Sequence, residues 1–146
     1  MNEDEAGIRA LIEERTAAMR DKDSARAVAT LAEDVVAFEL APPLALGPAA
    51  ARDEAALAAW LAAWDGPVEI EIRDLHVEAG GEVGWSRSLN RLHGRLKDGR
   101  QVDMWLRSTL AFRKAGGGWR IVHGHSSVPI RMDGSYRAAL DLSPEA

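Results

Sequence analysis

The chain has 146 residues, which is enough for one domain with a sizeable hydrophobic core. Its formal net charge of −5 argues against nucleic acid as a partner, because nucleic acids are bound chiefly by Lys and Arg that neutralise phosphates. The absence of cysteine excludes disulfides and thiolate chemistry. The N-terminus is acidic, and no stretch approaches the roughly 20 apolar residues of a membrane span. We therefore expect a soluble, cytoplasmic protein without a signal peptide.

The first half of the chain is predicted to be mainly helical. An amphipathic first helix is indicated by apolar residues at helical spacing, namely Ile8, Leu11, Ile12 and Met19. Arg15 falls inside this apolar stripe. A short second helix is expected to begin with Asp23 or Ser24 as its cap. The alternating, β-branched segment 34–40 favours a strand, and an Ala-rich helix is predicted over 49–64.

The second half changes to a period of two, which is typical of strands. Residues 68–73 alternate between apolar and charged side chains, so this strand has one solvated face. Two long strands over 82–96 and 101–114 are joined by the hairpin signal KDGR, and a last strand is expected over 119–128. Helices first and an antiparallel sheet afterwards predict a single α+β domain with its helices on one face of the sheet.

Two segments, EDVVAFELAPPL at 33–44 and MWLRSTLAFRKAGGGWRIVHGHSSVP at 104–129, add a family resemblance to this order of elements. The chain resembles the SnoaL-like, ketosteroid isomerase-like branch of the nuclear transport factor 2-like superfamily over nearly its whole length. The resemblance implies a cone-shaped, cystatin-like fold in which a curved antiparallel sheet wraps around three helices, with a pocket at the wide end. It implies one domain over 1–146, with an ordered core over about 6–130 and a C-terminal tail over 131–146.

The resemblance also implies functional positions. Glu39 stands where the isomerases carry their carboxylate base, Arg15 where they place a tyrosine that donates to the developing oxyanion, and Ser108 where they place a protonated aspartate. Both donors differ here, and the only tyrosine, Tyr136, lies in the tail, which argues against steroid isomerisation. Glu39 can also be a solvated residue at a strand end, and Arg15 can extend its charged head to the helix edge. A buried Arg15 would need Glu39 or an anionic ligand as its partner.

The faces of the strands predict the lining of the pocket. If the apolar face of the second long strand is directed towards the helices, small polar residues line the pocket: Ser88, Asn90, Ser108 and Ser126. A register slip of one residue would instead bring Arg107 and His125 into it. Trp60 and Trp64 either flank the pocket mouth or belong to the core.

Tryptophan, arginine and histidine gather on the opposite face, in the set Trp85, Arg91, Trp105, Arg107, Trp119, His123 and His125. Because Trp and Arg favour interface cores, we expect a homodimer through this outer sheet face. His123 and His125 point to the same side of the last strand, as metal ligands can, but a site needs a third ligand and residues 126–128 supply no carboxylate. We therefore expect interface histidines, and neither a bound metal nor a cofactor.

Two classes of function follow. The favoured interpretation is a small-molecule pocket protein, a metal-independent isomerase, lyase or cyclase that uses Glu39 as its base. The alternative is a non-catalytic ligand-binding or oligomerisation module that resembles the association domain of calcium/calmodulin-dependent kinase II. The carboxylate at position 39 favours the enzyme, whereas the missing tyrosine and aspartate favour the module.

Overall fold

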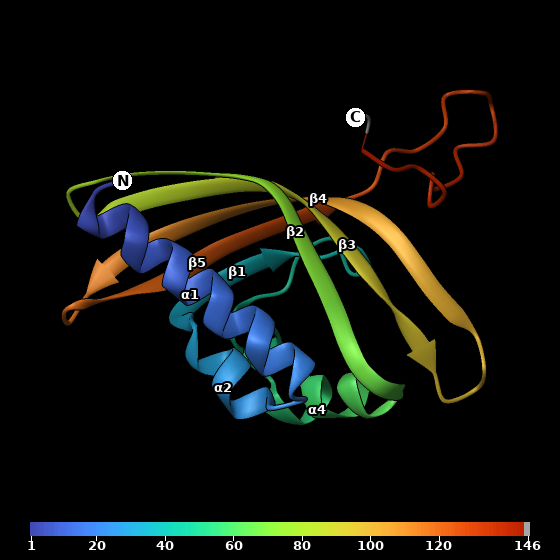
Figure 1. Cartoon of the computed structure of the whole chain (residues 1–146), viewed down its shortest axis with the longest axis horizontal. Coiled ribbons are helices and arrows are strands. Elements are labelled where there is room, and N and C mark those ends of the chain that lie inside the picture. Colours follow the sequence, from blue (N-terminus) through green and yellow to red (C-terminus); the bar gives the residue numbers. More distant parts are fainter. Residues whose placement is uncertain (145–146) are drawn as a thin grey trace.

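The computed structural model describes residues 1–144, so residues 145–146 of the predicted tail lie outside the described part of the chain. Helices lie on one side of a curved sheet, and the C-terminal segment projects away from them (Figure 1). This arrangement confirms the predicted α+β fold. Within the described residues, no helix combines the length and the apolar character that a membrane crossing requires. In chain order the elements are α1 (Glu3–Arg20), α2 (Ser24–Ala29), β1 (Leu31–Phe38), α3 (Pro48–Ala51), α4 (Glu54–Ala62), β2 (Trp64–Gly80), β3 (Val83–Leu96), β4 (Gln101–Ala115) and β5 (Gly118–Ser127).

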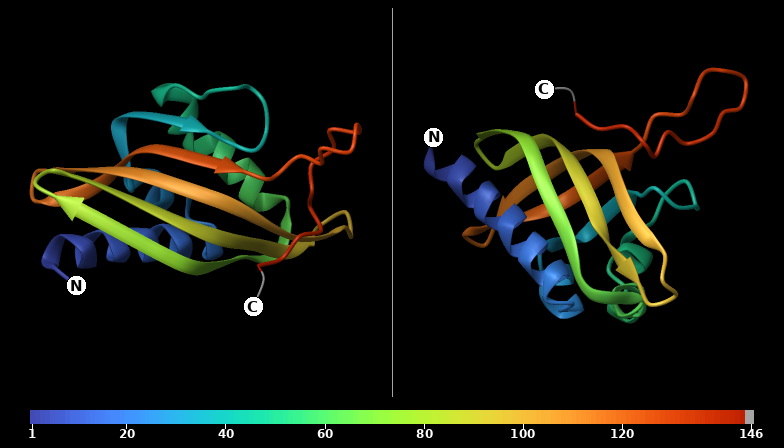
Figure 2. Two further views of the ribbon diagram at one scale, coloured as in Figure 1. Left: turned by 90° about the horizontal axis from the view of Figure 1, so that it is seen from above. Right: turned by 45° about the vertical axis from the view of Figure 1, so that its right-hand side comes forward.

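The five strands form one sheet in the order β1-β5-β4-β3-β2. Neighbouring strands are antiparallel, as predicted, except that β1 pairs parallel with β5 at one edge. Parallel neighbours need a long connection, and here the chain between them passes through two helices and three other strands. The left view of Figure 2 shows β1 beside β5, with the long strands next to them.

Side-chain caps explain where the helices begin. The Oδ1 atom of Asn2 accepts a hydrogen bond from the backbone N–H of Glu5 at 2.8 Å and so satisfies a free donor of α1. Asp23 caps α2 in the same way, which settles the choice between the two predicted caps. Asp53 caps α4.

The helix predicted over 49–64 is in fact two helices. A break at Arg52 and Asp53 separates α3 from α4, and the chain enters β2 already at Trp64. The prediction was wrong here because the alanines at 49–51 and 55–56 favour a helix on both sides of the break. Asp53 nevertheless acts as an N-cap and begins a second helix. The helix predicted too far along the chain also hid the start of the following strand: predicted over 68–73, it begins at Trp64 and continues to Gly80.

A β-bulge in β5 changes which side chains face the helices. Phe112 pairs with Ile121 and Ala111 pairs with His123, so one extra residue is inserted into β5. As a result Trp119 and Ile121 are buried at 6% and 1% exposure, whereas His123 lies on the outer face. The prediction that Trp119 belongs to the outer face was therefore wrong, because strict alternation does not allow for a bulge.

The core consists of two clusters along α1. The first lies at the end of the domain where α1 begins and is formed by Ile8, Ile12, Val77, Phe112, Trp119 and Ile121. The second lies where β2 begins, and Met19 of α1 packs against its buried residues, Leu61, Trp64 and Val68. Arg15 is the α1 residue that stands between the two clusters.

Candidate functional site

A cavity of about 740 Å³ lies between the two core clusters, on the helix side of the sheet. Its volume falls within the range of sites that hold small organic ligands. Side chains from α1, α2, α4 and all five strands contribute to its wall, and most of them are apolar. The polar and charged residues of the lining are Arg15, Glu39, Asp53, Asn90, Ser108 and Ser126.

The strand register places a row of hydroxyl groups on the inner face of the sheet. Ser88 pairs directly with Ser108, and Ser108 pairs with Ser126, across three neighbouring strands. Ser108 and Ser126 line the cavity. Arg107 and His125 therefore occupy the outer face, and the alternative register considered from the sequence does not occur.

Asn90 also belongs to this inner face. The Ser88 hydroxyl donates a hydrogen bond to Oδ1 of Asn90 at 2.7 Å. This bond occupies the amide oxygen of Asn90 and leaves its amide nitrogen as a donor towards the cavity.

Glu39 follows the last residue of β1, where the chain turns away from the sheet. Alternate residues of this segment, Val35, Ala37 and Glu39, line the cavity, so the carboxylate continues the inner face of β1. Glu39 is exposed, which places it at the mouth rather than in the depth of the cavity. Among the described residues, none forms a hydrogen bond or ion pair with its carboxylate.

Arg15 enters the cavity from α1. The residue is half-buried, but its Nε atom is inaccessible to solvent and has no hydrogen-bond partner within residues 1–144. Burial lowers the pKa of the guanidinium, and the attraction of Glu39 partly opposes this effect. The two groups do not approach to ion-pair distance. Glu39 is therefore not the direct partner of Arg15, and in the described part of the chain the Nε–H of Arg15 is left without the partner that a buried arginine was expected to need.

Only one of the two predicted tryptophans lines the cavity. Trp60 does so and is 42% exposed, whereas Trp64 is 2% exposed and belongs to the second core cluster. Gly94 explains the position of Trp64, because a Cβ atom at residue 94 would lie 3.1 Å from the Trp64 ring. The φ angle of Gly94, +154°, also favours glycine. The prediction of Trp64 as a pocket residue is therefore corrected.

Sequence reasoning missed Asp53, which is the second acidic residue of the lining. Its carboxylate accepts a hydrogen bond from the N–H of Ala56 at 3.0 Å and is thus already engaged in capping α4. The dipeptide of Asp53 and Glu54 before an Ala-rich run is a helix-start signal that could have located it.

The two histidines of the last strand surround Phe38 of the edge strand β1. Their ring centroids lie 4.6 Å (His123) and 5.4 Å (His125) from the Phe38 ring. The Nδ1 atom of His123 lies 2.6 Å from the backbone oxygen of Val36, at hydrogen-bond distance. Residues 1–144 contain no group of three or more His, Cys, Asp or Glu side chains arranged to hold a metal ion.

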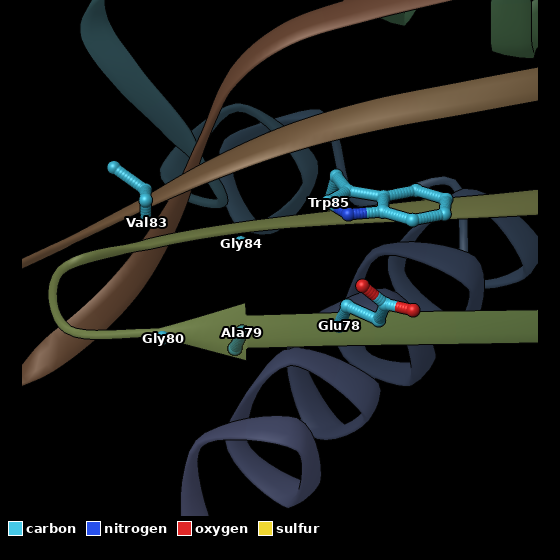
Figure 3. Close-up of a pocket in the computed structure, with 6 residues that line it drawn as sticks. All are labelled: Glu78, Ala79, Gly80, Val83, Gly84 and Trp85. Carbon is cyan, nitrogen blue, oxygen red and sulfur yellow. The ribbon is translucent and has the colours of Figure 1, made fainter.

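A second hollow of about 400 Å³ lies at the hairpin between β2 and β3, far from these groups. Figure 3 shows Glu78 and Trp85 on neighbouring strands beside it. Glu78 is paired with Nε2 of His76 at 3.0 Å, and the remaining lining residues are small or apolar. The hollow therefore has fewer polar groups that could bind a ligand or react with it than the cavity between the core clusters has.

The chain belongs to the SnoaL-like domain family, whose model matches residues 8–131. An NTF2-like protein of unknown function from Pseudomonas putida KT2440 shares 33% sequence identity, with a TM-score of 0.83 over 97% of this chain and 96% of that chain. None of the curated proteins matches the sequence.

More distant solved structures share the fold. A putative scytalone dehydratase from Novosphingobium aromaticivorans DSM 12444 is 14% identical, with a TM-score of 0.75 over 97% of this chain and 94% of that chain. A ketosteroid isomerase-like protein from Erwinia carotovora atroseptica SCRI1043 is 22% identical, with a TM-score of 0.67 over 87% of this chain and 97% of that chain. These similarities confirm the predicted NTF2-like, cystatin-like architecture.

Proposed function

We propose that the protein is a metal-independent enzyme that removes a proton from carbon in a small organic molecule, as an isomerase, lyase or cyclase. One observation carries the proposal. The Glu39 carboxylate has no hydrogen-bond or ion-pair partner among the described residues and opens into a mostly apolar cavity that also contains the Arg15 guanidinium and the Ser108 hydroxyl. A base, a cationic group and a hydroxyl donor around an apolar space form the minimum set for proton abstraction next to a carbonyl group.

The proposed chemistry assigns a role to each group. Glu39 accepts the proton of a C–H bond next to a carbonyl, and the electron pair of that bond moves to the carbonyl oxygen. The Ser108 hydroxyl donates to this oxygen, and the positive charge of Arg15 in the same cavity stabilises the negative charge that develops. Return of the proton to another carbon completes an isomerisation, and loss of a leaving group from the neighbouring carbon completes an elimination.

The experiment uses a probe that any well-placed carboxylate base can act on. In nitrobenzisoxazole, removal of the ring C–H proton breaks the N–O bond and releases a coloured cyanonitrophenolate. We expect the wild-type protein to accelerate this elimination and Glu39→Gln to lose roughly a hundredfold in rate, the lower end for a positioned base because Glu39 is exposed.

The matched control is Glu33→Gln, which removes an exposed carboxylate from the same strand outside the cavity. We expect this variant to keep the wild-type rate. Equal rates in wild type and Glu39→Gln would reject Glu39 as the base and would favour the alternative of a non-catalytic ligand-binding or oligomerisation module.

We also propose that two copies of the chain pair through the outer face of the sheet. Apolar side chains are exposed there, with Phe38 at 37% and Trp85 at 39% exposure. Arg91 is already held by Asp103 through two hydrogen bonds of 2.8 Å, whereas Arg107 makes no ion pair within residues 1–144. An aromatic patch with an unneutralised arginine is typical of an interface core.

A further inference from the structure

We infer that the cavity takes an organic acid, whose carboxylate binds Arg15 while its apolar body fills the space between the two core clusters. This inference names the substrate class of the proposed enzyme and so rests on the proposed function, although the binding step can be measured without any turnover.

The Nε–H group of Arg15, unpartnered within residues 1–144, favours an anionic ligand. Its Nε–H is shielded from water and has no acceptor among the described residues, so the donor is left without compensation. An uncompensated buried donor on a charged group is costly. The Nε–H groups of Arg9 and Arg52 are likewise buried without an acceptor within residues 1–144, but of these three arginines only Arg15 lines the cavity, where a ligand can supply the missing partner. A carboxylate matches the planar guanidinium with two parallel hydrogen bonds, which a single carbonyl oxygen cannot form.

The distribution of charged residues in the cavity lining also favours an anion beside Arg15. Of the three charged residues in the described lining, Glu39 and Asp53 are exposed, whereas Arg15 is half-buried and its Nε is inaccessible to solvent. Asp53 is occupied by the cap of α4, and Glu39 does not reach ion-pair distance from the guanidinium. The protected part of the cavity is therefore positively charged, although the chain as a whole carries −5.

The volume and the lining of the cavity indicate which body the ligand carries besides its carboxylate. Its volume of about 740 Å³ accommodates a body of one to several rings or a branched chain. The walls of the cavity are mostly apolar, with Met19, Leu92 and Leu110 among the lining residues. The predicted ligand is a monoanion with a large apolar body, and neither a sugar phosphate nor a dicarboxylate fits this lining.

The test compares naphthylacetate with its neutral amide, naphthylacetamide, by isothermal titration calorimetry at neutral pH. The two probes differ in charge and share the same body. We expect the wild-type protein to bind the carboxylate at least about tenfold more tightly than the amide, since hydrogen bonds to charged groups are the stronger ones. Arg15→Gln should abolish this preference, because the affinity for the carboxylate falls much more than the affinity for the amide.

Two control variants test whether the preference for the carboxylate depends on Arg15 itself. Arg9→Gln removes the same charge from the same helix outside the cavity and should keep the preference. Glu39→Gln should keep or slightly increase it, because a like charge at the mouth is removed. Equal affinity of the wild type for both probes, which needs no variant, would overturn the inference. A preference that persists in Glu39→Gln, together with a lost elimination rate, would support both proposals separately.

Discussion

Arg15 is the residue at which stability and binding are expected to conflict. The Nε atom of its guanidinium is inaccessible to water, and the protein supplies no acceptor for this Nε–H within the described residues. Replacing a poorly compensated buried charge by an apolar side chain of similar size is often stabilising. Whether an apolar substitution of Arg15 raises or lowers the free energy of unfolding therefore distinguishes a binding role from a structural role.

We predict that Arg15→Leu raises the free energy of unfolding by about 1 kcal/mol, because it removes a desolvated donor and adds apolar contact. Urea unfolding followed by tryptophan fluorescence measures this change. The comparison variant Arg9→Leu should stabilise less, because Arg9, whose Nε is also buried without a partner within residues 1–144, donates from Nη2 to the backbone oxygen of Leu75 at 3.5 Å and so loses a contact between α1 and β2. A loss of stability in Arg15→Leu would identify Arg15 as a structural residue and contradict the assigned role.

Single residues also show where sequence reasoning succeeds. Asn90, Ser108 and Ser126 were placed by alternation along the strands, which is a local rule, whereas Glu39 and Arg15 were placed by the family resemblance; all five residues line one cavity of the structure. Trp64 was misplaced because its burial depends on Gly94, thirty residues away in sequence on a neighbouring strand. Such a close approach of an aromatic ring to a glycine on another strand leaves no local pattern.

At the scale of elements, the strand boundaries that lie at a hairpin turn were the most predictable. The strands β3 and β4 were predicted within one residue, because alternation and a hairpin turn mark both of their ends. Elements with an irregularity inside them were the least predictable. The bulge in β5 reverses the phase of one half of the strand relative to the other, and a one-residue insertion has no signature in a single sequence.

The bulge has a functional consequence at this scale. It allows Trp119 and Ile121 to complete the first core cluster while Gly124 and Ser126, farther along the same strand, line the cavity. It also leaves His123 and His125 on the outer face. One strand thus contributes to the core, the cavity and the proposed interface.

At the scale of the whole molecule, the sheet separates two proposed activities. Its inner face carries the cavity, and its outer face carries the aromatic and basic patch around Phe38, Trp85 and Arg107. Because strand side chains alternate between the faces, substitutions on the outer face should leave the cavity unchanged. Pairing and binding can therefore be tested independently.

We predict that the protein is a dimer at micromolar concentration and that Arg107→Glu weakens the dimer, because it places an acidic group in the middle of the patch. Arg113→Glu, near the end of β4, should have a smaller effect on association. Light scattering at several concentrations measures both variants. A monomeric mass for the wild-type protein would remove the proposed interface.

The central claim is that one cavity holds both the base and the anion-binding group. The most direct test is whether naphthylacetate inhibits the Glu39-dependent elimination of nitrobenzisoxazole. We predict competitive inhibition, with an inhibition constant equal to the calorimetric dissociation constant, and its loss in Arg15→Gln. Binding of naphthylacetate that leaves the elimination rate unchanged would show that Glu39 and Arg15 serve separate sites, and would contradict the account.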